Sequence, residues 1–102
     1  MRLVINIGDN AVGVDGTFSE GLDLSQCGLP ENFRAFQWNE HGGDTGHIEY
    51  DSPNVANDQV NAIPAWATAC IAVWQAKLDQ EAAALAAAEA AAAEAAEAEN
   101  AP

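Results

Sequence analysis

The last fifth of the chain restricts the possible folds more than any other part, because it consists almost entirely of alanine. Between Ala82 and Ala98, 13 of 17 residues are alanine, and most of the others are glutamate. Alanine has the highest helix propensity of the amino acids, so this tract predicts a helix. We expect the helix to run from about residue 64 to about residue 97. At 1.5 Å per residue it is roughly 50 Å long, which is more than a small head can cover, so its end should project.

Residues 63–80 carry the apolar face of the same helix. Pro64 suits the first helical position, because its missing N–H would have no helical partner there. Side chains able to face a core then recur at spacings of four and three residues, which places them on one side of a helix. These residues are Trp66, Cys70, Val73, Trp74 and Lys77. We expect the tryptophans to pack on a sheet formed by the preceding residues.

Residues 1–62 predict a β-rich head. Short β-branched segments separated by turn residues predict strands at Leu3–Ile7, Val12–Val14 and Thr17–Phe18, continued by Leu22–Leu24. Asp15-Gly16 is the strongest hairpin signal in the chain, because both residue types tolerate the positive φ of a tight turn. We therefore expect these strands to form an antiparallel meander.

A second hairpin is predicted around the glycine-rich turn at residues 39–46. Phe33–Trp38 and His47–Tyr50 flank the turn, and in the second segment Ile48 and Tyr50 alternate with His47 and Glu49. Residues 55–62 are polar, and their pattern is ambiguous. The side chains expected in the core are Ile5, Phe36, Trp38, Ile48, Tyr50 and Trp66.

The predicted fold class is α+β, with a small antiparallel β-sheet (meander plus hairpin) followed by one long C-terminal alanine-rich α-helix. We divide the chain into a β-rich head at 1–62, a helix packing on the head at 63–80, and a projecting Ala/Glu helix with a frayed tail at 81–102. Fraying is expected because the glutamates lie toward the helix C-terminus, where the helix dipole disfavours negative charge.

Charge limits the possible partners. The chain has 16 acidic residues against 3 basic ones, which gives a net charge of −13. Binding to a nucleic-acid backbone needs lysine and arginine to neutralise phosphates, so we expect no nucleic-acid partner. Anionic membrane surfaces are disfavoured for the same reason, and the alanine tract is too rich in glutamate to span a bilayer. Neutral or basic proteins are the expected partners.

The projecting helix is the candidate interaction surface. Trp74, Leu78, Leu85 and Ala92 are the contacts we expect a partner to use, and Leu78, Leu85 and Ala92 are spaced by seven residues. The spacing is typical of a helix seam, but the intervening positions are too mixed for a strict coiled coil. Two interpretations stay open at this point, a docking helix and a solvated spacer.

No pattern indicates an enzyme, and we expect no catalytic residue, no metal and no cofactor. His41 and His47 flank the glycine-rich turn without the further ligands that a metal site requires. Gly42–Gly46 lacks the lysine and following helix of a phosphate loop. Cys27 and Cys70 form neither a CxxC motif nor a disulfide-rich framework, which favours a reducing compartment.

The segments Gly28–Asn39 and Thr45–Tyr50, with Ile63-Pro64-Ala65-Trp66 after them, resemble small proteins of tailed bacteriophages that are encoded near tail-fibre and baseplate components. The resemblance covers residues 3 to about 75, and its most specific parts are Gln37-Trp38 and Gly46–Tyr50. It implies a virion tail part or an assembly helper, and it supplies no catalytic residue.

Three functions follow as hypotheses. The first is a non-enzymatic structural protein of the phage virion, made in the host cytoplasm and located in the tail, which docks on a fibre or baseplate subunit through its β head and long helix. Three copies of the helix would then be able to bundle as a homotrimer. The alternatives are a tail-fibre assembly chaperone and an acidic decoy of a host DNA-binding protein.

Overall fold

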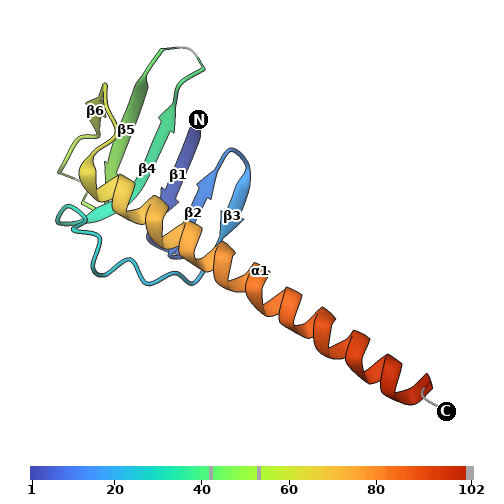
Figure 1. Cartoon of the computed structure of the whole chain (residues 1–102). Helices are drawn as coiled ribbons and strands as arrows, with labels where there is room; N and C mark the ends of the chain where they lie inside the picture. The colour runs from blue at the N-terminus through green and yellow to red at the C-terminus, as the bar shows by residue number, and fades with distance from the viewer. Residues whose placement is uncertain (42, 53, 101–102) are drawn as a thin grey trace.

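The computed structural model describes residues 1–41, 43–52 and 54–100, with side chains as far as residue 96. Within these ranges it shows a six-stranded antiparallel sheet followed by one long helix, which confirms the predicted α+β class (Figure 1). The strands are β1 (Arg2–Asn6), β2 (Ala11–Val14), β3 (Thr17–Ser19), β4 (Phe33–Asn39), β5 (Thr45–Tyr50) and β6 (Asp58–Val60). The helix α1 spans Ala65–Asn100.

The strand order is β3-β2-β1-β4-β5-β6, so the predicted meander and the predicted hairpin share one sheet. They meet where β1 pairs with β4, with Ile5 opposite Phe36 and Leu3 opposite Trp38. In the Asp15-Gly16 turn both residues have positive φ, 50° and 87°, as a tight hairpin requires. Residue 42, in the second predicted turn, lies outside the described residues.

The sheet differs from the prediction at Leu22–Leu24 and gains a strand in a segment whose pattern was ambiguous. Leu22–Leu24 is not a strand, because this part of the connection between β3 and β4 forms no ladder with a strand, although both leucines bury their side chains in the core. The ambiguous residues 55–62 contain β6, which pairs with β5 at the edge of the sheet. Its sequence, Asp58-Gln59-Val60, is too short and polar to show a strand pattern.

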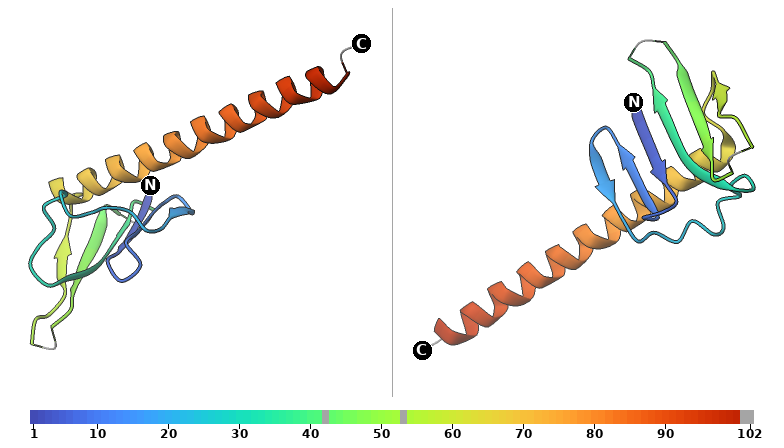
Figure 2. Two further views of the ribbon diagram at one scale, coloured as in Figure 1. Left: turned by 90° about the horizontal axis from the view of Figure 1, so that it is seen from below. Right: turned by 180° about the vertical axis from the view of Figure 1, so that it is seen from behind.

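The helix lies against one face of the sheet (Figures 1 and 2). It begins directly after Pro64, whose carbonyl oxygen accepts hydrogen bonds from the backbone N–H groups of Ala67 and Thr68. The Trp66 ring makes T-shaped contacts with the rings of Phe33 and Phe36, at centroid distances of 5.1 and 5.2 Å. Such contacts contribute about 0.5–1.5 kcal/mol beyond the area they bury.

The core lies between α1 and this face of the sheet. Of the predicted core residues, Ile5, Phe36, Trp38 and Ile48 are buried, while Tyr50 and Trp66 are half-buried against the same cluster. The helix contributes Ala67, Cys70 and Trp74, and the β3–β4 connection contributes Leu22, Leu24 and Cys27.

The helix continues well past β3 and gives the molecule its elongated shape (Figure 2). The principal extents are 72 × 27 × 19 Å. Every side chain from residue 79 to residue 96 is exposed, so this part of α1 has no contact with the head that would bury it.

Candidate interaction surfaces

The four helix residues predicted to contact a partner differ in burial, because α1 leaves the sheet between them. Trp74 is only 9% exposed, and its indole N–H donates a 3.0 Å hydrogen bond to the carbonyl oxygen of Thr17. The structure therefore places Trp74 in the core, because this turn of α1 crosses β2 and β3. Leu78 is half-buried at the edge of the core, whereas Leu85 is 61% exposed and Ala92 is exposed.

The exposed half of α1, residues 79–96, is the first candidate surface. It is about 27 Å long at 1.5 Å per residue, and alanine methyl groups cover most of it. Leu85 is its one large apolar side chain, and Glu89 and Glu94 lie toward its far end. No basic residue occupies the last turn, so the negative end of the helix dipole is not compensated within the helix.

The second candidate surface is the sheet face opposite α1. Side chains alternate between the two faces of a strand, and the pairing registers align one row across all six strands on this face. The row is Phe18, Gly13, Val4, Gln37, His47 and Gln59. Phe18 is 57% exposed, and its ring lies over Gly13. A Cβ added at Gly13 would stand 2.3 Å from a carbon of that ring.

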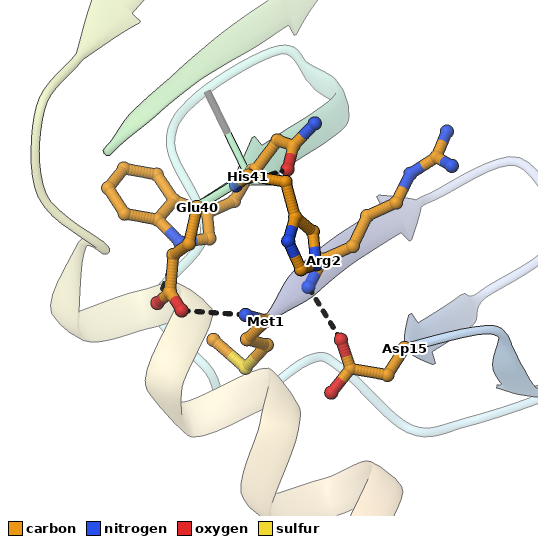
Figure 3. A network of polar contacts seen from close by, with 7 residues as sticks. Met1, Arg2, Asp15, Glu40 and His41 are labelled. Carbon is orange, nitrogen blue, oxygen red and sulfur yellow. Dashed lines mark hydrogen bonds and ion pairs between the residues drawn. The ribbon is translucent and has the colours of Figure 1, made fainter. Parts of the chain in front are cut away.

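Two shallow hollows flank the centre of this open face. One has a volume of about 180 Å³ and is lined by Arg2, Gln37 and His47 among others. The other, of about 270 Å³, is lined by Arg2, Val4 and Phe18 with neighbouring glycines. Arg2 borders both hollows, and its guanidinium points away from Asp15 (Figure 3). The open face thus combines an aromatic ring, amides and a cation.

A polar network joins the beginning of β1 to the ends of β4 and β2 (Figure 3). The α-amino group of Met1 donates a 2.6 Å hydrogen bond to Glu40, and the same carboxylate accepts one of 3.3 Å from the Trp38 indole. The backbone N–H of Arg2 donates to Asp15 at 2.8 Å. These contacts hold Arg2 at the rim of both hollows.

The network also shifts two titrations. The hydrogen bond to Glu40 raises the pKa of the Met1 amino group above its ordinary value of 8.0. The hydrogen bonds from Met1 and Trp38 lower the pKa of the Glu40 carboxyl below its ordinary value of 4.5. Both shifts favour the charged forms of the two groups.

The described residues hold no group of three or more His, Cys, Asp or Glu side chains placed to bind a metal ion. His41 is exposed in the turn after β4, whereas His47 lies on the open face 3.4 Å from Glu49. No helix within the described ranges is both long and apolar enough to cross a membrane.

No protein-family model, curated protein or solved structure matches this chain. The two candidate surfaces therefore rest on the structure of this chain alone.

The sequence interpretation missed the open face as a unit. It placed His47 and Glu49 on one side of their strand, as the structure does, but gave no role to Phe18, Gln37 or Gln59. Alternation within each strand was the available signal. It did not show which residues of different strands stand side by side, because that depends on register.

Proposed function

We propose that the protein is a non-enzymatic structural component of a tailed-phage virion that docks on a fibre or baseplate subunit. The observation that carries the proposal is the exposed half of α1, residues 79–96, which buries nothing in the protein's own head. The resemblance of Gly28–Asn39 and Thr45–Tyr50 to small tail-region proteins supports the virion setting.

The chemistry of the exposed helix indicates what its partner offers. Alanine side chains let another backbone approach closely, and Leu85 supplies one apolar anchor. Glu89 and Glu94 lie near the negative end of the helix, so lysine or arginine on the partner would stabilise that end. We infer a partner groove that is apolar along its length and basic at one end, with the open face of the sheet as a second contact.

An assembly chaperone would use the same surface but would leave before the particle is complete. The acidic decoy has less support, because it needs carboxylates in ordered rows. Asp79 and Glu81 lie two residues apart, which places them on opposite sides of α1, and Glu89 and Glu94 lie five apart, about 140° around it.

The deciding experiment is cryo-electron microscopy of the mature particle, with mass spectrometry of its purified proteins. We expect a compact head with a projecting rod on the tail, whose contacts identify the partner. A mature particle without the protein contradicts the structural role. Fibre subunits that lose solubility when the protein is not co-expressed would then favour the chaperone.

A matched pair of variants tests the helix contact. Leu85→Gln removes the apolar anchor while keeping a good helix former, and Ala83→Gln makes a similar change on the opposite side of the helix. We expect Leu85→Gln to weaken binding to the isolated tail subunit by about tenfold or more, since a buried leucine contributes about 1.5–3 kcal/mol. Ala83→Gln should bind like the wild type. Equal binding by all three proteins would remove Leu85 from the interface.

A further inference from the structure

The two cysteines meet in the core although they are 43 positions apart in the chain. Cys27 lies in the β3–β4 connection and is 8% exposed, and Cys70 lies on α1 and is 0% exposed. Both belong to the same cluster of buried residues, and Cys27 lies near enough to Cys70 to contribute to the raised pKa of its thiol. Both are free thiols in this structure.

Residues 23–31 of the connection are held to the rest of the protein mainly by side chains. Their backbone hydrogen bonds are local, such as those from Cys27 N–H to Leu24 and from Ser25 N–H to Asp23. Bonds to other elements lie near the ends of the connection, where Leu22 bonds Asn10. Opening this segment therefore breaks no sheet or helix ladder, and segments of this kind open more readily than the whole protein unfolds.

The seam between the connection and the helix is also incompletely filled. A hollow of about 360 Å³ lies there, lined by Leu22, Val73 and Lys77 among others. The first residues of the connection thus border α1 across a gap.

We propose that Cys27 and Cys70 are a disulfide-forming pair, and that the bond fastens the β3–β4 connection to α1 once the protein meets a small-molecule disulfide oxidant. The inference rests on the fold and is independent of the proposed function. The bond would join two parts of the core: a segment whose backbone hydrogen bonds are local, and the helix that covers the sheet.

The reaction is thiol–disulfide exchange with oxidised glutathione as the model oxidant. The Cys27 thiolate attacks one glutathione sulfur, which forms a mixed disulfide and releases one glutathione. The Cys70 thiolate then attacks the Cys27 sulfur and releases the second glutathione. The protein loses two hydrogens and two electrons, and the oxidant gains them.

The order of attack follows from where the two thiols lie. Burial, together with the hydrogen bond to Cys27, raises the pKa of Cys70 to about 12, so its thiolate is scarce in the closed state. Cys27 moves out of the core with the connection and reaches the oxidant first. Cys70 stays on the helix and completes the bond as the connection closes.

The test uses the full chain with oxidised glutathione, followed by alkylation in denaturant, intact mass measurement and peptide mapping. We expect a protein lighter by two hydrogens, without alkylation, and with a Cys27–Cys70 peptide. Glutathione adducts that persist without this peptide would overturn the proposal.

Single variants test the order of attack. Cys70→Ala should accumulate one glutathione adduct at Cys27, whereas Cys27→Ala should keep its remaining thiol free over the same period. The opposite pattern would contradict the assignment of Cys27 as the first nucleophile. Because the bond itself is measured on the wild-type chain, a poorly folding variant does not affect that result.

A stability measurement tests whether the bond fastens the fold. Closing a loop of this length should raise the Tm of the oxidised protein by roughly 10 °C relative to the reduced protein. The oxidation rate should also rise in urea below the main unfolding transition, because the connection opens locally. An unchanged or lower Tm, or a rate that rises only on global unfolding, would count against the proposal.

Discussion

Single residues decide how the β5 side of the sheet is built. Gly46 lies where a Cβ would stand 2.8 Å from the Gln37 carbonyl oxygen and 2.9 Å from the Trp38 ring, so only glycine fits between β5 and β4 without displacement. Tyr50, at the end of β5, donates a 2.6 Å hydrogen bond from its hydroxyl to Asp58 at the start of β6. That bond ties the short edge strand to its neighbour.

We predict that Tyr50→Phe weakens the β6 edge by about 0.5–1 kcal/mol, the contribution of one solvent-exposed hydrogen bond. The bond to Asp58 raises the pKa of Tyr50 above its ordinary value of 10.0. Its contribution is therefore complete below pH 10.0 and is lost as the pH rises through the raised pKa.

Thermal unfolding of wild type and Tyr50→Phe across this range measures the effect. The Tm difference should be constant below pH 10.0 and shrink above it. A difference that persists in the more alkaline range would show that the hydroxyl acts other than through this bond.

At the scale of elements, α1 is one continuous helix whose two halves are stabilised in different ways. Up to Leu78 it is stabilised by tertiary packing, with Ala67, Cys70 and Trp74 buried against the sheet. From residue 79 onward it depends on alanine's intrinsic helix propensity. Isolated helices are marginal in water, so the second part is the more easily lost.

Truncation after Gln80 should therefore leave the head folded. We expect the Tm to change by no more than a few degrees while the helical circular dichroism signal falls, because residues 81–96 are exposed and bury nothing in the core. A second truncation after Ala72, which removes Trp74 and its bond to Thr17, should unfold the head. If the chain that ends at Gln80 also unfolds, the projecting residues stabilise the head.

At the scale of the whole molecule, the chain is far from compact. Its Cα radius of gyration is 18.9 Å, whereas a compact domain of this length has a radius of about 13 Å. The net charge of −13 repels other copies of the chain and favours a neutral or basic partner.

We predict that small-angle X-ray scattering in moderate salt gives a monomer with a radius of gyration close to that of the extended structure. The chain truncated after Gln80 should approach the compact value. A smaller radius for the full chain would mean that the exposed helix frays or folds back. Forward scattering of three chains would instead support the bundled homotrimer.

Much of the architecture follows from local patterns. Alanine content predicted the helix, the spacing of Trp66, Cys70 and Trp74 predicted its buried face, and Asp15-Gly16 predicted a hairpin. β6 was missed because three edge residues carry too little pattern. Trp74 was predicted both to pack on the sheet and to contact a partner, because periodicity shows which side of a helix it lies on, but not where the sheet ends beneath that helix.

The sequence by itself determined the class of fold, the sign of the charge and the length of the helix, because propensity, turn chemistry and charge are properties of neighbouring residues. Only the tertiary structure decided which strands pair, which part of α1 is left exposed, and that Cys27 meets Cys70. Those features depend on contacts between residues far apart in the chain. Register and packing set them, and no local pattern encodes either.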